Sequence, residues 1–199
     1  MAISYPLALP THTGIAQIEL RAVNAVAYSQ SPFTFAGQAH AYQGQMWQAD
    51  VSLPPMHAED AERWLGFLLS LRGRFGTFLL GDPLRTSLRG TATAATITGS
   101  AGDNTVSATV TAGQTLLVGD YIQLGSGSNA TLHKVLVDYT GTGSATNLEI
   151  WPGLRTDRSA VSATLSNAKG VFRLTSNEQA WSINEASIYG ITFGAMEAI

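Results

Sequence analysis

Residues 58–83, AEDAERWLGFLLSLRGRFGTFLLGDP, predict an amphipathic helix, a glycine stop, a short β-strand and a Gly-Asp-Pro turn in close succession. Acidic residues fill the expected first turn, where a helix N-terminus favours negative charge, and Gly73 follows the last leucine as a C-cap. We therefore expect a helix over about 58–72 and a strand over 75–80. Pro83 ends the strand because proline cannot donate to a sheet ladder. Nothing in this stretch is arranged for chemistry.

The apolar arc of the expected helix is wider than one core-facing stripe needs. Phe67 widens it on one flank, so that apolar side chains cover roughly 200° of the helix. Either the helix is sunk deeply into its own domain, or it packs on its sheet on one side and on a neighbouring subunit on the other. The second interpretation places Phe67 at a subunit interface. The rest of the arc consists of Ala61, Trp64, Leu65, Leu68, Leu69 and Leu71.

The composition excludes several classes of protein. The 199 residues include 20 glycines, and only 13% are charged, which is typical of a β-rich chain with many turns. The net charge of −3 does not suit a protein whose main ligand is a phosphate backbone. The absence of cysteine excludes disulfides, thiolate catalysis and the common structural zinc sites. We expect neither a signal peptide nor a membrane span, and hence a soluble protein made in the cytoplasm.

Strand-like alternation flanks the helix in sequence. Residues 16–28 and 47–53 alternate between apolar and polar side chains, which predicts half-buried antiparallel strands. Phe33 and Phe35 alternate before an expected turn at Gly37. In the last strand, Tyr189, Ile191, Phe193 and Ala195 share one face, and the other face carries Gly190, Thr192 and Gly194. We expect this last strand to return to the sheet of the first domain.

The composition changes near residue 88, where a Thr/Ala/Gly/Ser-rich segment begins. Its short strand-like runs and glycine-marked turns predict a small β-barrel, OB-like in type. We therefore expect an antiparallel β-sandwich or split-barrel domain with one helix, formed by residues 1–87 and 168–199, and an inserted barrel over 88–167. The runs lie at 92–98, 105–111, 121–124, 132–139 and 146–151.

Candidate chemical groups are sparse. The histidines show no metal-ligand spacing; they are His12, His40, His57 and His133. His57 could form a metal-binding or acid–base pair with Asp60, but we expect it to be a structural residue near the helix N-terminus. We predict no catalytic residue, no metal site and no cofactor. A hydrolase has no support in the sequence, and a pair of glycosidase carboxylates distant in sequence stays open.

Two groups of side chains have a binding and a structural interpretation. Tyr121, Tyr139 and Trp151 in the inserted segment could form a sugar-stacking platform or fill the barrel core. Basic residues cluster around the Gly-Asp-Pro turn. They could pair with carboxylates of a neighbouring subunit, for which the arginine fork is well suited, or form a solvated rim; they are Arg72, Arg74, Arg85 and Arg89.

Two blocks carry a resemblance to a known family. LRGRFGTFLLGDP at 71–83 and KGVFRLTSNEQAWSINEASIYGITFGAMEA at 169–198 resemble the distal tail proteins of long-tailed bacteriophages. That resemblance implies a virion protein, assembled in the host cytoplasm, that forms a homo-oligomeric ring, most often a hexamer. The ring would join the tail tube protein to the hub or baseplate proteins, and DNA and the tape-measure protein would pass through its channel.

The resemblance implies a structural protein and no enzyme. If the ring passes DNA, its channel should be neutral to negative, and Glu19, Gln48 and Asp50 lie on polar strand faces that could line it. The arginines near the turn would then face rims or subunit contacts. The alternative function is a carbohydrate-binding, host-receptor module of the tail tip, carried by the inserted barrel.

Overall fold

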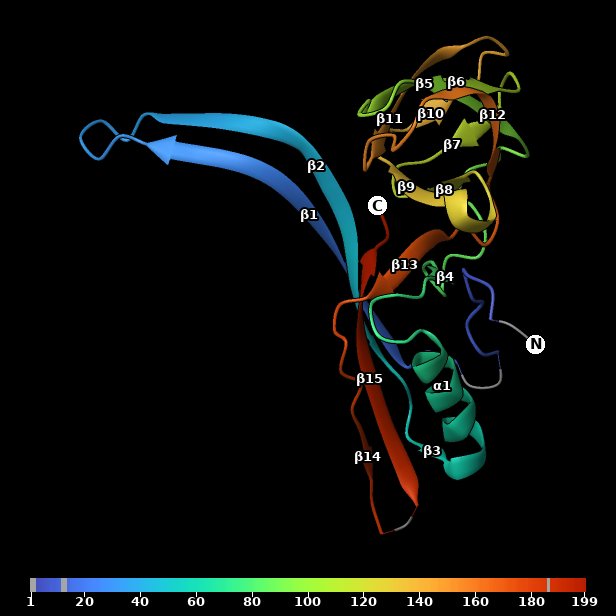
Figure 1. Ribbon diagram of the computed structural model, residues 1–199. Helices are drawn as coiled ribbons and strands as arrows, with labels where there is room; N and C mark the ends of the chain where they lie inside the picture. The colour runs from blue at the N-terminus through green and yellow to red at the C-terminus, as the bar shows by residue number, and fades with distance from the viewer. Residues whose placement is uncertain (1–2, 12–13, 186) are drawn as a thin grey trace.

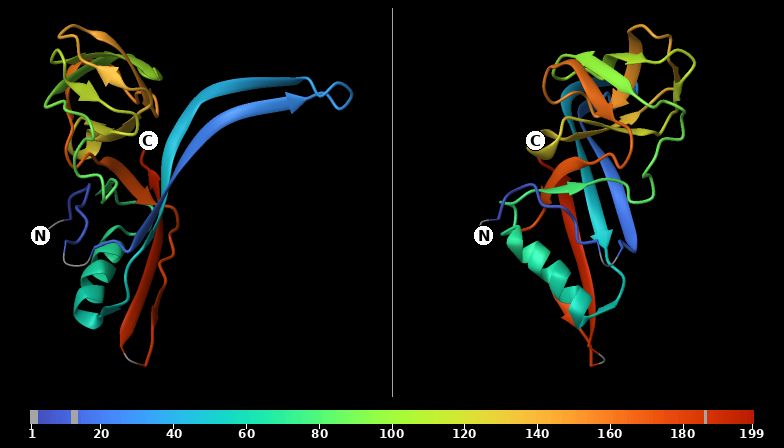
Figure 2. Two further views of the ribbon diagram at one scale, coloured as in Figure 1. Left: turned by 180° about the vertical axis from the view of Figure 1, so that it is seen from behind. Right: turned by 90° about the vertical axis from the view of Figure 1, so that its right-hand side faces the viewer.

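The computed structural model describes residues 3–11, 14–185 and 187–199, and the protein is mainly β (Figure 1). An antiparallel sheet with one helix packed on it forms one part of the described chain, and a closed β-barrel forms the other. A two-stranded ribbon projects to one side from the region where the sheet and the barrel meet (Figures 1 and 2). The predicted fold class is confirmed.

The open sheet has the strand order β1-β2-β15-β13-β4, and β3 and β14 also pair with β15. The last long strand, β15, therefore lies at the centre of the sheet, which confirms the prediction that it returns there. The strands are β1 Gln17–Gln30, β2 Gly37–Ser52, β3 Met56–His57, β4 Phe78–Leu80, β13 Gly170–Leu174, β14 Trp181–Ile183 and β15 Ile188–Glu197.

Helix α1, Ala58–Ser70, covers one face of this sheet (Figure 1). His57 is its N-cap residue, as expected, and Glu59 and Asp60 occupy the first turn. The chain leaves the helix through Arg72 and Gly73, whose φ angles are 51° and 66°. The helix itself ends at Ser70 and its C-cap residue is Leu71, so the predicted C-cap at Gly73 is wrong by two residues; Gly73 lies in the turn that follows.

Phe67 is part of the protein's own core. It is 8% exposed, and its ring centroid lies 5.9 Å from that of Trp64 and 5.6 Å from that of Phe78. The wide apolar arc therefore does not place Phe67 at a subunit interface, because the sheet, through Phe78 of β4, already covers it. Leu69, which we assigned to the core stripe, is instead 58% exposed.

The strand expected at 75–80 is shorter than predicted, because residues 71–76 form a turn. The Gly76 amide donates to the Leu71 carbonyl at 2.7 Å, and a β-carbon on Gly76 would lie only 2.6 Å from Cε1 of Tyr5. The turn leaves Phe75 exposed. Phe33 and Phe35 also lie outside any strand, in the loop between β1 and β2.

The inserted segment folds as a closed barrel with the strand order β11-β6-β5-β12-β8-β9, six strands within the described residues. Strand β12, which lies between β5 and β8, was missed because its sequence RSAVSAT has no large apolar side chain. The barrel strands are β5 Ala95–Gly99, β6 Thr105–Val110, β8 Tyr121–Leu124, β9 Thr131–Val135, β11 Thr146–Trp151 and β12 Arg158–Thr164; β7 Thr115–Leu116 pairs with β10 Tyr139–Thr140, and η1 spans Gly127–Asn129.

The chain enters and leaves the barrel side by side. A β-carbon on Gly81 would lie 2.2 Å from the carbonyl oxygen of Ala168, and the amide of Asn167 donates to the carbonyl of Thr86 at 2.8 Å. The sheet strands fall before residue 81 and after residue 169, and the barrel strands lie between them. That the two parts fold independently, with boundaries at 88 and 167, stays a prediction.

Replacing Phe67 by Asp should unfold the sheet, because the new carboxylate would be buried among aromatic rings at a cost of several kcal/mol. Leu69→Asp, two positions along the same helix, is the matched control and should unfold at close to the wild-type temperature. Thermal unfolding followed by circular dichroism measures both. A folded Phe67→Asp protein would show that the helix does not need this residue for its core.

Candidate assembly surface

The hairpin of β1 and β2 continues well beyond the sheet. We call its outer part, residues 24–45, the arm. Strand pairing runs to its end, where Gln30 faces Gly37, and residues 24–30 and 32–44 are exposed. Figures 1 and 2 show the arm curving away from the rest of the molecule. A two-stranded ribbon with both faces in water is marginally stable by itself. We therefore expect the arm to bind another protein surface.

The two faces of the arm differ. Val26 faces Ala41 and Tyr28 faces Ala39, on the side of the ribbon that continues the core face of β1. Ser29 and His40 lie on the other side. Alternation along β1 is therefore the same in both halves, but only the inner half packs against the core, through Ile18 and Leu20. Val26 is 54% exposed and Tyr28 is 64% exposed.

The loop at the end of the arm presents two aromatic rings. The Ser31 hydroxyl accepts from the amides of Phe33 and Thr34 at 3.3 and 3.4 Å, and the Phe35 amide donates to the Ser31 carbonyl at 3.0 Å. The side-chain amide of Gln30 donates to the carbonyl of Phe35 at 2.9 Å. Despite this ordered backbone, Phe33 is 90% exposed, which is unfavourable unless another surface covers it.

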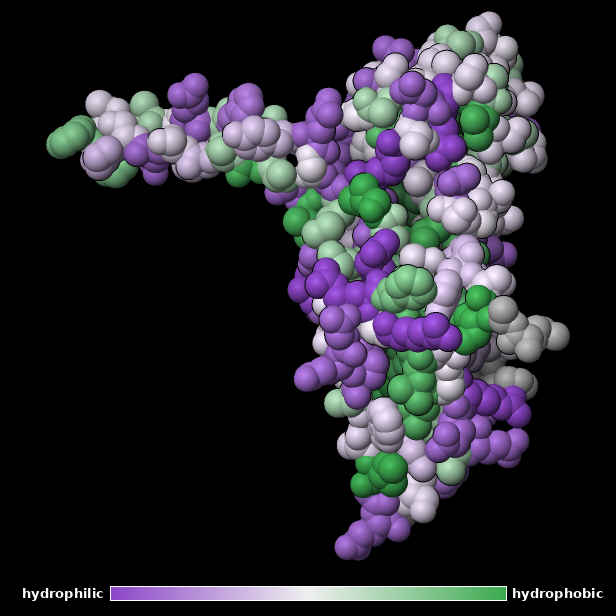
Figure 3. Space-filling model, viewed as in Figure 1, coloured by the Kyte–Doolittle hydropathy of each residue, from purple (hydrophilic) through white to green (hydrophobic). Residues whose placement is uncertain are grey.

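The arm carries no formal charge. The sequence has no Asp, Glu, Lys or Arg between Arg21 and Asp50. Figure 3 shows hydrophilic and hydrophobic residues interspersed along its length. Interface cores are depleted of charged residues and enriched in aromatic ones, whereas free surfaces are not. The long uncharged run is the sequence signal for this surface, whereas apolar alternation alone does not distinguish it from a covered strand.

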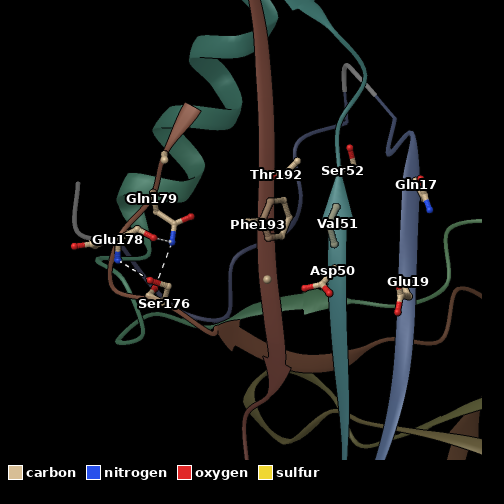
Figure 4. A pocket seen from close by; sticks show the side chains of 12 residues that line it. Gln17, Glu19, Asp50, Val51, Ser52, Ser176, Glu178, Gln179, Thr192 and Phe193 are labelled. Atoms are coloured by element: carbon tan, nitrogen blue, oxygen red, sulfur yellow. Dashed lines mark hydrogen bonds between the residues drawn. The ribbon is translucent and has the colours of Figure 1, made fainter. Parts of the chain in front are cut away.

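The face of the sheet opposite α1 is polar. Gln17, Ser52 and Thr192 form one row across three strands, and Glu19 and Asp50 face each other in the next. With Glu178 and its neighbours before β14, they line an open groove of about 530 Å³ (Figure 4). Arg21 forms ion pairs with Glu19 and Asp50, and Gln48 faces Arg21 across β1 and β2. The expected polar face therefore exists; that it lines a channel stays a prediction.

The four arginines do not form one cluster. Arg74 lies at the margin of the polar face, where its guanidinium is 3.6 Å from Sδ of Met196. Arg89 contacts the barrel, because its guanidinium donates to the carbonyl of Val118 at 3.2 Å. Arg72 and Arg85 are exposed in the turns that follow α1 and β4. Their part in subunit contacts stays a prediction.

The three aromatic residues of the inserted segment do not form a sugar-stacking platform. Tyr139 is buried in the barrel, where its hydroxyl donates to the carbonyl of Ala108 at 2.7 Å. Tyr121 is buried against Trp47, and their ring centroids are 6.1 Å apart. Trp151 is half-buried and meets the same Trp47 edge to face at 4.5 Å. The interpretation of Tyr121 and Tyr139 as core residues is confirmed.

His133 is a buried structural residue. Its Nδ1 donates to the carbonyl oxygen of Pro152 at 2.7 Å, and its Nε2 lies 2.8 Å from the hydroxyl of Thr131. The pKa of His133 is lowered to about 4, mainly by burial and to a smaller extent by the positive charges of Arg155 and Arg158, while the hydrogen bond with Pro152 acts in the opposite direction. His133 is therefore neutral at pH 7.

Other chemical sites are not apparent in the described part of the chain. No group of three or more His, Asp or Glu side chains is placed to hold a metal ion within residues 3–11, 14–185 and 187–199. His40 packs edge to face on Tyr42, and His12 lies outside the described residues. Across the same residues, no helix combines the length and the apolar character needed to cross a membrane.

Comparison with known proteins adds no relative. No protein-family model matches the chain, and a search of curated proteins finds no significant match. The resemblance to phage distal tail proteins therefore depends on the two sequence blocks alone, and the functional interpretation depends on them and on the surfaces described above.

The free energy of unfolding should fall as the pH falls from about 6.5 to about 4, because the unfolded chain protonates His133 before the folded barrel does. The expected loss is about 3 kcal/mol in total. His133→Gln should lack this component of the pH dependence. Chemical denaturation of both proteins across this window measures the difference, and identical pH profiles would show that His133 does not titrate as the burial requires.

Proposed function

We propose that this protein is a structural component of a phage tail, and that copies of it associate through the arm into a ring at the distal end of the tail. The observation that carries the proposal is the arm: an uncharged ribbon with exposed aromatic residues and no cover within the described chain. The resemblance of residues 71–83 and 169–198 to distal tail proteins supports the same function.

The partner that we assign to the arm is a second copy of this chain. The arm projects from one side of the molecule, and α1 lies on the other side of the sheet (Figure 1). A contact between two different surfaces of identical subunits is head-to-tail, and such contacts generate rings when the rotation closes. The resemblance favours six copies, with the tail tube protein on one side of the ring and hub or baseplate proteins on the other.

We propose that the polar face of the sheet lines the channel of the ring. Glu19, Asp50 and Glu178 supply negative charge there, balanced in part by Arg21, and the rest of the groove is uncharged. Arg74 and Arg173 lie near Met196 on the same side of the sheet, so the charges of this face nearly balance, and a wall without net positive charge would let DNA pass without being held. Catalysis forms no part of this proposal, and the receptor-binding alternative loses the aromatic platform on which it depended.

Val26→Asp tests the assembly surface. It puts a carboxylate on the apolar face of the arm, outside the core, so the protein should stay folded but fail to associate. Ser29→Asp puts the same charge on the polar face of the same strand and should associate like the wild type. The mass in solution, measured by light scattering, decides the outcome. Full assembly of Val26→Asp would contradict the assigned surface, and a wild-type protein that is monomeric at high concentration would contradict self-association.

A further inference from the structure

The arm leaves the sheet at a break in its own hydrogen-bonding ladder. Asn24 faces Gln45, but the next regular pair is Val26 with Ala41, so the register shifts between them. Gly44 lies at this break, where a β-carbon would be 2.9 Å from Cβ of Ala25. Bulges of this kind bend a ribbon and increase its twist. A bend in a two-stranded ribbon is a natural hinge, because no third strand holds it.

The barrel contacts the arm at this break. The indole Nε1 of Trp151 donates to Oδ1 of Asn24 at 2.8 Å. Oε1 of Gln45 accepts from the amide of Gly153 at 2.7 Å and from Nδ2 of Asn104 at 3.0 Å, and Nε2 of Gln45 lies 3.3 Å from Oδ1 of Asn104. Both residues of the last regular pair are therefore bonded to the barrel.

The barrel residues that make these contacts are themselves held in place. Nδ2 of Asn104 also donates to the carbonyl of Ile150 at 2.9 Å, and the ring of Trp151 packs edge to face on Trp47. Gln43 lies against the barrel at Gly102, where a β-carbon would be 2.9 Å from its Nε2. Gly102 has a φ of 91°, so the turn can approach the arm this closely only with glycine.

We propose that the inserted barrel is a brace that fixes the direction in which the arm leaves the sheet. Asn104, Trp151 and the Gly153 amide hold Asn24 and Gln45, and thereby stiffen the bulge. This assigns a mechanical role to a domain whose aromatic residues Tyr121, Tyr139 and Trp151 form no sugar-stacking platform. Its consequence for the ring rests on the proposed function: a head-to-tail contact closes into a ring only when the angle between copies is fixed, and the brace would fix it.

The absence of cysteine allows a direct test in the full chain. Spin labels on Thr34→Cys at the arm tip and Ser144→Cys in a barrel turn report one distance by pulsed electron paramagnetic resonance. The Val26→Asp background keeps neighbouring copies from holding the arm. The braced protein should give a narrow distance distribution. Asn24→Ala with Gln45→Ala should broaden and shift it, and amide exchange in the outer part of β1 should accelerate about tenfold.

Gln114→Ala is the matched control, because Gln114 bonds to Thr93 within the barrel and should leave the distribution narrow. Should the double variant fail to fold, Trp151→Phe keeps an aromatic ring on Trp47 but removes the indole donor, and a smaller broadening is expected. A wild-type arm with a broad distribution, or variants indistinguishable from the control, would overturn the brace. The measured distance lies within a single chain. Neither of these two contradicting results would therefore arise merely because the ring proposal is wrong.

Discussion

Trp47 is the residue on which the arrangement of sheet, barrel and arm depends. Its ring is buried between the sheet and the barrel, against Tyr121 and Trp151, and its indole donates to the carbonyl of Leu132 at 2.9 Å. Its backbone amide donates to the carboxylate of Glu197 at 3.0 Å. One aromatic side chain thus joins β2 and β9 at the point where the arm begins.

Glu197 completes this junction through a two-bond fork with Arg155 of the barrel, at 3.0 and 2.5 Å. Both side chains are largely buried, so removing either partner would leave an uncompensated charge in the interior, which is strongly destabilising. The pair also requires a specific geometry, unlike apolar packing. The junction therefore combines apolar burial with hydrogen bonds that orient the barrel relative to β15. The barrel in turn contacts the base of the arm at Asn24 and Gln45.

The sequence predicted the positions of helices and strands better than it predicted which of their apolar faces are buried. Helix α1, the return of β15 and the inserted barrel all follow from periodicity and turn residues. Phe67 and Val26 show the limit: each extends an apolar pattern, yet Phe67 is buried and Val26 is exposed. Periodicity indicates which residues share a face, but only the tertiary fold shows whether that face is covered. Strand β12 was missed for a related reason, because small side chains suffice where a barrel closes on itself.

We propose that the apolar face of each arm is covered by the next copy in a closed ring. Cryo-electron microscopy of the purified protein at assembling concentration tests it most directly. We expect closed rings, six-fold by the resemblance, in which Val26, Tyr28 and Phe33 lie against a neighbouring subunit. Isolated monomers with free arms, or rings whose subunits meet elsewhere and leave the arms in solvent, would contradict it.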